Sequence, residues 1–295
     1  MLKTRVGDVI WLVEQPDHAR VSGYLVAHWG DAGGFARPGH YPGAVHSDRW
    51  RDEVILAIAQ HDNGWWEWEA MPVIDSADGW PMNLTDVASQ SPDEGFRRWQ
   101  LGIPRLAERH PYAALLISLH AYWLYAFAFN DLAADGEDAY RHPLFSSGGD
   151  VIDLVVEREL TRQFLEGQRA LQDRLLGAVK RDTELAPAAV KEHLFGHLKL
   201  LQLMDALSLL LAFNDPQERE LVNIPKSGWQ DRVTMTWNPA GGHRVVCEPY
   251  PFDADPLPVC MPARVVRSED AVGAPLARLY RSPVQTLSFE LASKR

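Results

Sequence analysis

The sequence contains little cysteine and no excess of positive charge. Its two cysteines, Cys247 and Cys260, both fall in the last quarter without the spacing of a metal-binding pair, so we expect no disulfide framework and a reducing, cytoplasmic location. Lysine and arginine number 29 against 40 aspartate and glutamate residues, a net charge of −11. Nucleic acids and anionic membranes attract basic surfaces, so neither is expected as a partner.

Several motifs of common enzymes are also absent. The sequence contains no GxGxxG, GxxxxGK[ST], GxSxG or CxxC, which disfavours dinucleotide-binding, P-loop and serine-hydrolase functions. It shows no internal repeat or low-complexity segment. The first residues, MLKTRVGDVIWLVEQ, place Asp8 inside the apolar stretch and offer no cleavage site, so we expect no signal peptide.

One long hydrophobic run is present, the segment 111–129, PYAALLISLHAYWLYAFAF, and it approaches the length of a membrane span. It carries a central histidine and several tyrosines, and it lacks basic flanks. A helix that is apolar on all sides is also typical of the centre of a large soluble core. We therefore predict a buried helix and no membrane partner.

The pattern of periodic segments predicts a mainly α protein. Residues 2–14 indicate two short strands around the turn Gly7-Asp8, and 220–293 indicate a small antiparallel sheet. Caps, among them Ser47 and Ser91, together with prolines and apolar periodicity predict helices at about 16–29, 47–62, 92–104, 111–129, 151–181 and 188–213. We expect three regions: a β segment over 1–14 that pairs with the C-terminal sheet, a helical metal-binding domain over 15–215, and a small β-rich subdomain over 216–295.

The dipeptide His61-Asp62, at the end of the second predicted helix, is a candidate metal-binding pair. Consecutive helical side chains diverge by about 100°, so the two can converge on one ion only where the helix unwinds. Asn63-Gly64 supplies a helix end directly after them. A helix C-terminus carries free carbonyls and partial negative charge, which favour a bound cation.

Three further residues are expected to face the core. His18 lies on the apolar stripe of its helix, His120 lies within the all-apolar helix, and Asp205 follows the leucine stripe of the last helix. Each also has a structural interpretation, as a hydrogen-bonded core histidine or a carboxylate paired with arginine or a helix end. A buried carboxylate is the hardest of these to satisfy without a cation. The conjunction with His61-Asp62 favours a metal site.

Imidazole and carboxylate ligands together suit iron, manganese, zinc or a related divalent ion, magnesium included, rather than a metal that seeks thiolates. Such a ligand set leaves coordination positions for water, and a bound cation lowers the pKa of that water enough to make it a nucleophile.

Other histidines fit a metal site less well. His28 lies about 15 Å along the helix from His18, so the two cannot bind one ion. His46 is expected in a loop. His193 and His197 have the i,i+4 spacing of a metal pair but lack the glutamate of the HExxH metalloprotease motif.

The motifs resemble those of a known superfamily. HDNGW is similar to the HDIGK of the cyclic-dinucleotide phosphodiesterase branch of the HD-domain superfamily, all-α metal-dependent phosphohydrolases, and LMDALSL is similar to its closing aspartate helix. The combination of QPDHA, HDNGWWEWE, SLHAYWLY and MDALSL is more similar to an uncharacterised domain-of-unknown-function family allied to HD domains. This resemblance covers most of the chain, including PFDADPL. It implies an HD-domain-like helical bundle, here with a small antiparallel β-subdomain formed by the N- and C-terminal segments.

The resemblance implies metal-ligand roles for His18, His61, Asp62 and Asp205, and for His120 as an additional histidine of two-metal members. Two departures follow. Trp65 stands where the phosphodiesterase branch has its lysine, which removes a phosphate-facing cation. No second additional histidine is found before Asp205 at workable spacing, and whether the site holds one or two metals stays open.

By this resemblance, the expected function is hydrolysis of a phosphorylated small molecule or nucleotide by metal-activated water. An HD-fold iron oxygenase is an alternative, and a non-catalytic metal- or ligand-binding module is another. Asp62, Glu69 and Arg20 are the candidate catalytic residues, with Glu69 as an acid–base group and Arg20, one turn from Asp17, as an anion-binding cation. The oligomeric state is left open.

Tryptophans at positions 65, 66 and 68 follow the HDNG turn and alternate with Glu67 and Glu69. They have two interpretations: a lid over a substrate pocket, or a staple that fastens the loop to the helical core.

Overall fold

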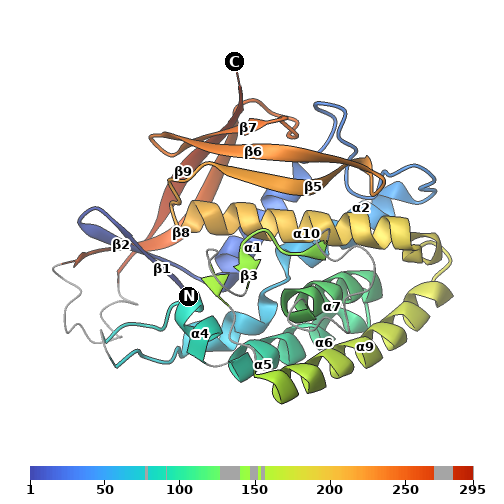
Figure 1. The fold of residues 1–295 in the computed structure, drawn as a ribbon, viewed down its shortest axis with the longest axis horizontal. Helices are drawn as coiled ribbons and strands as arrows, with labels where there is room; N and C mark the ends of the chain where they lie inside the picture. The colour runs from blue at the N-terminus through green and yellow to red at the C-terminus, as the bar shows by residue number, and fades with distance from the viewer. Residues whose placement is uncertain are drawn as a thin grey trace.

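A curled seven-stranded sheet lies against a group of helices in the computed structural model of the chain (Figure 1). The structure describes residues 1–76, 79–90, 92–126, 140–146, 152–153, 157–268 and 282–294. The strands are β1 (Leu2–Val6), β2 (Val9–Val13), β3 (Phe145–Ser146), β4 (Ile152–Asp153), β5 (Arg219–Gly228), β6 (Asp231–Gly241), β7 (Arg244–Glu248), β8 (Leu257–Arg267) and β9 (Val284–Ser293). The helices are α1 (Gln15–Ala27), α2 (Ser47–Ala59), α3 (Trp66–Ala70), α4 (Leu84–Gln90), α5 (Pro92–Gly102), α6 (Pro104–Ala107), α7 (Pro111–Ala126), α9 (Arg158–Arg181) and α10 (Lys191–Ala212), with 3-10 turns η1 (Asn63–Trp65) and η2 (Ala186–Ala189).

Both ends of the described chain contribute to the large sheet, whose order is β1-β2-β8-β9-β7-β6-β5. The first hairpin turns between Val6 and Val9, where Gly7 adopts a φ of 61° that suits a two-residue turn. Strand β2 then pairs antiparallel with β8, which joins the N-terminal hairpin to the C-terminal strands. The pair β7 and β9 is parallel and the other neighbours are antiparallel, so the sheet is mixed.

Helix α10 lies beneath the sheet and packs on α1, α2, α7 and β5 (Figure 1). Every residue from Leu198 to Ala212 is buried, including the polar stripe of Lys199, Gln202, Asp205 and Ser208, because each side of the helix faces another element. Among the described helices, only α10 has the length and the apolar composition of a membrane-spanning helix. The protein itself buries 89% of its most apolar stretch. Helix α7, in the predicted hydrophobic run, is likewise mostly buried.

The prediction of a mainly α, HD-domain-like helical bundle with a small antiparallel β-subdomain is wrong, because the fold is α/β with a seven-stranded mixed, half-barrel sheet. The sequence pattern indicates only a small appendage, because the predicted strands cluster at the two ends of the sequence. Strands β5, β6, β8 and β9 are each ten or eleven residues long, and together they form a layer of the core. Helix α10 has apolar residues on the side that the other helices leave open as well, and the sheet covers that side.

Some local boundaries differ from the predicted ones. Ser47 is the first residue of α2, and its N-cap is His46, which makes no side-chain cap hydrogen bond. The prediction that Ser47 caps this helix is therefore wrong. The predicted helix 151–181 begins instead at Arg158, after the short strand β4. The predicted cap at Ser91 and residues 127–129 of the predicted buried helix lie outside the described residues.

Candidate metal centre

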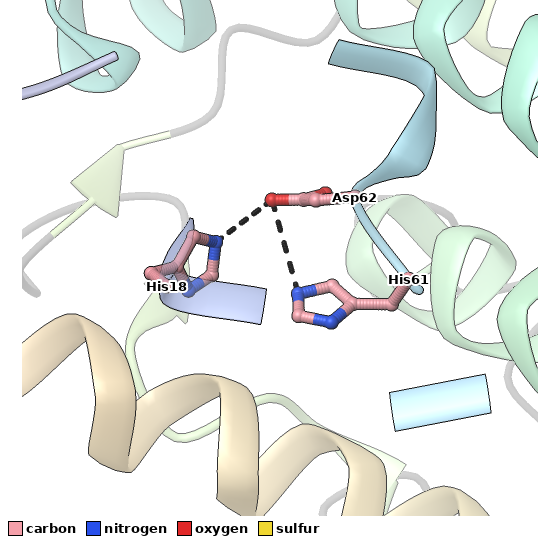
Figure 2. A group of neighbouring side chains, drawn as sticks. All are labelled: His18, His61 and Asp62. Atoms are coloured by element: carbon pink, nitrogen blue, oxygen red, sulfur yellow. Dashed lines mark hydrogen bonds and ion pairs between the residues drawn. The ribbon is translucent and has the colours of Figure 1, made fainter. Parts of the chain in front are cut away.

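Three side chains from two neighbouring elements converge in the core beside α10. His18 comes from α1, and His61 and Asp62 follow the last turn of α2 (Figure 2). One ligand atom from each lies within 4.8 Å of the other two, and all three residues are buried. The chain leaves helical geometry after Ala59, so the consecutive residues His61 and Asp62 both point toward His18.

The turn after Asp62 is held by a close crossing of two backbones. A Cβ added at Gly64 would lie 2.0 Å from the carbonyl oxygen of Arg98 on α5, and one added at Gly102 would lie 2.5 Å from Asn63 Oδ1. The HDNG sequence therefore has glycine at position 64 because only glycine permits this approach. Arg105 fastens the same turn from the other side by donating a hydrogen bond to the Asn63 carbonyl.

The orientation of His61 leaves one ring nitrogen for the site. Its Nδ1 donates to the Ile58 carbonyl at 2.8 Å. The opposite nitrogen, Nε2, lies 3.5 Å from Asp205 Oδ1 and 3.8 Å from Asp62 Oδ2. Burial lowers the pKa of His61, but the two carboxylates raise it more strongly, to about 9. In the metal-free protein His61 is therefore a cation between two anions.

His18 is held at both of its ring nitrogens. Nε2 lies 2.8 Å from Asp62 Oδ2, and Nδ1 lies 2.9 Å from the hydroxyl of Ser208 on α10. That hydroxyl also donates to the Asp205 carbonyl at 2.9 Å and lies 2.8 Å from the Ser22 hydroxyl. Because Ser208 donates to the Asp205 carbonyl, its oxygen faces His18 Nδ1 as an acceptor, and the Asp62 carboxylate is the acceptor at Nε2.

Asp205 extends the cluster from α10. Its Oδ2 lies 3.4 Å from His120 Nε2 and 3.2 Å from His142 Nε2, and its Oδ1 lies 3.9 Å from His18 Nδ1. Burial raises the pKa of this carboxyl, but His61 and the hydrogen bonds of the surrounding histidines hold it well below its usual range. Asp205 is therefore ionised, and it links the first three residues to a second group of imidazoles.

His120 lies on α7 with its ring edge-on to those of His61 and Trp99. Both ring nitrogens are buried: Nδ1 has no partner among the described residues, and Nε2 faces the Asp205 carboxylate at 3.4 Å. Burial lowers the pKa of His120, so the ring is neutral and presents a lone pair. A buried imidazole without partners is costly unless a ligand or an ion completes it.

His142 is the residue that sequence reasoning missed. It lies in the segment 140–146, outside any helix, so no helical periodicity marked it as core-facing. Its Nδ1 accepts a hydrogen bond from the backbone N–H of Leu144, and its ring is buried. With Nδ1 used as an acceptor, the neutral ring carries its proton on Nε2 and directs it toward Asp205. His142 therefore orients Asp205 in the metal-free protein.

Two side chains of α10 hold the segment that carries His142. Gln202 donates to the Tyr140 carbonyl at 2.7 Å, and the buried Lys199 donates to the Arg141 carbonyl at 2.9 Å. Burial lowers the pKa of Lys199 to about 7. Lys199 and Gln202 precede Asp205 on the same helix, so one helix positions both His142 and the carboxylate that it faces.

Comparison with known proteins assigns the chain to a family. Residues 1–268 match the family described as "Protein of unknown function (DUF3891)". The chain belongs to this family. The match includes every helix among the described residues and every residue of the candidate centre. Comparisons with curated proteins and with solved structures found no match.

In this DUF3891 chain, the two other predicted catalytic residues lie apart from the cluster. Arg20 is largely exposed and pairs with Asp17 on the same helix. Glu69 is buried, but its Oε1 accepts from the Gln15 backbone N–H and pairs with the Met1 amine. Neither is placed against His18, His61 or Asp62, whereas Asp62, the third predicted catalytic residue, lies within the cluster.

The tryptophans after the HDNG turn divide between the two interpretations. Trp65 and Trp68 are buried edge-on against each other and pack with Val87, which fits a staple between the loop and the helices. Trp66 is half-exposed, and the Arg105 guanidinium lies over its ring. Glu67 is exposed and pairs with Arg105, so it stabilises the turn from outside.

Histidines outside the candidate centre have structural partners. His197 accepts from the Gly39 N–H at 3.1 Å, and its other nitrogen lies 2.8 Å from the Tyr112 hydroxyl, so the i,i+4 pair with His193 leaves it no nitrogen for an ion. His28 lies at the surface and pairs with Asp253.

Proposed function

We propose that the chain is a metal-dependent hydrolase allied to the HD-domain superfamily. His18, His61, Asp62 and Asp205 would hold a divalent ion, iron, manganese, zinc or magnesium, and His120 would add a further ligand. The observation that carries the proposal is the convergence of His18, His61 and Asp62 within 4.8 Å of one another, with Asp205 3.5 Å from His61. The proposed similarity to HD domains rests on the ligand residues of α1, α2, α7 and α10. It does not extend to the whole fold, which is α/β.

The donor set fits such an ion. His120 Nδ1 is buried without a partner among the described residues, and Nε2 of His61 and of His120 face the Asp205 carboxylate at 3.5 and 3.4 Å. Asp62 and Asp205 bring two carboxylates into a site where the compensating positive charge in the metal-free protein is the His61 proton. Neutral imidazoles and carboxylates are the ligands that divalent transition ions take, and no thiol lies among them.

When bound, a divalent ion would supply a polarised water of lowered pKa and a positive charge for developing anionic oxygens. The chain's own residues would prepare the site. Ser208 and Asp62 fix the ring of His18 from opposite sides. Asp62 is the carboxylate nearest to the histidine pair and is the candidate proton acceptor. His142 orients Asp205, whose lowered pKa keeps it anionic during turnover.

For the substrate, we propose a phosphorylated small molecule or nucleotide. The support is the likeness of HDNGW and LMDALSL to the phosphohydrolase motifs. Trp65 takes the place of the lysine in those motifs and is buried against Trp68, so it offers no cation to a phosphate. In this proposal the phosphate charge is therefore neutralised by the ion itself, which makes hydrolysis strictly dependent on metal.

Hydrolysis by metal-loaded protein tests this proposal. Protein reconstituted with Mn²⁺ would be assayed on p-nitrophenyl phosphate, bis(p-nitrophenyl) phosphate and a series of mononucleotides. We expect turnover that chelation abolishes and that falls by about 100-fold or more in Asp62→Ala. His28→Ala, which changes an exposed histidine away from the cluster, is the matched control and should retain full activity. Metal-loaded wild-type protein that hydrolyses none of these compounds would contradict the proposal.

A second candidate function, an iron-dependent oxygenase, is favoured by one observation. His142 brings a further imidazole to Asp205 beside His120, so the centre holds more histidines than the sequence pattern indicated. Imidazole-rich sites suit iron. Protein loaded with Fe²⁺ without air and then exposed to oxygen would show oxygen consumption and a change in visible absorption if this function applies. Hydrolysis by the Mn²⁺ protein, with no response to oxygen, would exclude it.

A further inference from the structure

A buried carboxamide near the candidate metal centre lacks hydrogen-bond partners. Gln15, the first residue of α1, is wholly buried, and neither its Nε2 nor its Oε1 bonds to any described residue. A carboxamide can donate two hydrogen bonds and accept two, and burying it without them destabilises the folded state. Gln15 therefore has capacity for a partner that the described part of the chain does not supply.

The backbone at Gln15 is fixed, so a loose segment does not explain the missing partners. Its N–H donates to Glu69 Oε1 at 3.1 Å. Pro16 follows it in the first turn of α1, where the fixed φ of proline suits the helix and no N–H is required. The carboxamide thus projects from a well-defined helix start.

Gln15 lies on the face of α1 that carries His18. Residues three apart on a helix are neighbours, with Cβ atoms about 5–6 Å apart. Ser22 continues this buried stripe, and both it and His18 contact Ser208 of α10. Helical side chains lean toward the N-terminus of their own helix, so the His18 ring lies over the turn that Gln15 begins. The Gln15 carboxamide therefore lies beside the His18 ring, at the edge of the candidate metal centre.

A phosphate held at this centre needs hydrogen-bond donors from the chain. Asp62 and Asp205 are acceptors only when they are ionised. Trp65, which takes the place of the lysine in the similar phosphohydrolase motifs, packs against Trp68 and offers no cation. The carboxamide of Gln15 supplies two N–H donors and a carbonyl acceptor without adding charge. It matches a phosphate with its accompanying water, because phosphate oxygens accept hydrogen bonds and water also donates them.

We propose that Gln15 is a substrate-contacting residue of this site, whose Nε2 donates to a phosphate oxygen and whose Oε1 accepts from a water molecule beside that phosphate. The inference rests on the proposed function, because it needs a phosphate-bearing ligand at the centre. It has a physical consequence for stability. The carboxamide destabilises the ligand-free protein and stabilises the complex, so its removal should change the two in opposite directions.

Replacement by methionine separates these two effects. Gln15→Met keeps the approximate length and volume of the side chain and removes its donors and acceptor. We expect the melting temperature of the metal-free protein to stay the same or rise by a few degrees, because a buried polar group without partners is lost. In the Mn²⁺-loaded protein, we expect the dissociation constant for inorganic phosphate, measured by calorimetry, to increase about tenfold. The affinity for Mn²⁺ itself should stay close to that of the wild type.

Gln168→Met is the matched control. The Gln168 carboxamide is also buried, but its Oε1 accepts from the Ser118 hydroxyl at 2.7 Å. Its loss should lower the melting temperature by several degrees and leave phosphate affinity unchanged, the reverse of the result for Gln15→Met. The proposal is overturned if Gln15→Met lowers the melting temperature as much as Gln168→Met does, if it leaves phosphate affinity unchanged, or if Mn²⁺-loaded wild-type protein binds no phosphate.

Turnover is measured separately, so that failure of this inference is distinguishable from failure of the proposed function. Wild-type protein that hydrolyses no phosphate ester, but binds phosphate more tightly than Gln15→Met does, contradicts the proposed function and supports the contact with Gln15. Hydrolysis and phosphate binding that are equal in the wild type and in Gln15→Met contradict only the role of Gln15.

Discussion

His61 Nε2 lies 3.5 Å from Asp205 Oδ1, a contact that joins the end of α2 to the middle of α10. It places an imidazole between two buried carboxylates, since Asp62 stands on its other side. Burial lowers the pKa of His61, but these carboxylates raise it to about 9. The proton on His61 and a bound divalent ion would occupy the same space, so the two compete.

Metal affinity should therefore rise with pH. At neutral pH an ion must displace the His61 proton, whereas His120 and His142 are already neutral because burial lowers their pKa. We expect the association constant for Mn²⁺ to increase by up to about tenfold per pH unit between roughly pH 6.5 and 8.5. Titrations in two buffers of different ionisation enthalpy would detect the released proton. Equal affinity across that range, with no proton release, would show that His61 is not displaced.

Ser208 should control metal affinity without touching the ion. Ser208→Ala removes the partner of His18 Nδ1 and frees the ring to rotate or change tautomer. We expect metal affinity to fall by about 10- to 100-fold, as for other residues that orient a ligand. Ser22→Ala removes only the next hydroxyl in the relay and should have a smaller effect. Equal affinities in wild type and Ser208→Ala, measured by competition with a chromogenic chelator, would refute this role.

Replacement of His142 separates a positioning role from that of a required ligand. His142→Ala removes the group 3.2 Å from Asp205 Oδ2, and we expect metal affinity to fall, but by less than in His61→Ala. His142→Gln can still donate a hydrogen bond to Asp205 and should recover part of the loss. If His142→Ala lowers metal affinity as much as His61→Ala does, and His142→Gln restores none of that affinity, His142 is itself an indispensable ligand.

Lys199 should make stability depend on pH. Its folded pKa of about 7 is below the ordinary value of 10.5, so the unfolded chain binds the extra proton between these values and stability rises with pH across that window. His61 acts with the opposite sign, because its folded pKa is raised and its stabilisation is lost as pH rises toward 9. The comparison is therefore between variant and wild type at each pH.

Between pH 7 and pH 9 the unfolding free energy changes in both proteins. We expect this change to be about 2 kcal/mol less favourable in Lys199→Met than in the wild type. Urea unfolding at the two pH values measures this. Parallel pH dependences would show that Lys199 titrates normally in the folded protein.

Gly64 should be intolerant of any side chain. In Gly64→Ala the new Cβ would lie 2.0 Å from the Arg98 carbonyl, so α5 or the HDNG turn must move. We expect a loss of about 2 kcal/mol or more in unfolding free energy, together with weaker metal binding. Gly167→Ala on α9 is the matched control: its Cβ meets nothing within 4 Å, and alanine should stabilise that helix by about 0.5–1 kcal/mol. Similar stability changes in both variants would refute the crossing as a constraint.

The parts of the centre that could be predicted are those marked by helical periodicity. His18, His120 and Asp205 interrupt apolar stripes, and a buried polar residue in such a stripe needs a partner. His142 could not be found in this way, because a loop residue carries no periodicity and its position depends on Lys199 and Gln202 contacting the backbone beside it. Only closeness in sequence to the predicted ligands indicated Arg20 and Glu69, but α1 turns Arg20 to solvent and Glu69 pairs with the Met1 amine.

For the fold, the segment types were largely predictable but their assembly was not. The hairpin at Gly7 and the helices α1, α2, α7 and α10 follow from turn residues and apolar spacing. The extent of the sheet depends on the parallel pairing of β7 with β9 and on the β2–β8 pairing between distant segments. Such long-range pairings leave no local signature in the sequence.

The central claim is that His18, His61, Asp62 and Asp205 form a metal centre, and the metal content of the purified protein tests it most directly. Elemental analysis by mass spectrometry should find a transition metal at about one equivalent or more per chain in the wild type and in His28→Ala. In a His61→Ala/Asp62→Ala variant that metal should be lost, and chelator should lower the melting temperature of the wild type and of His28→Ala but not of this variant. A wild-type protein without a stoichiometric metal after reconstitution, with a melting temperature that ignores chelator, would contradict the account.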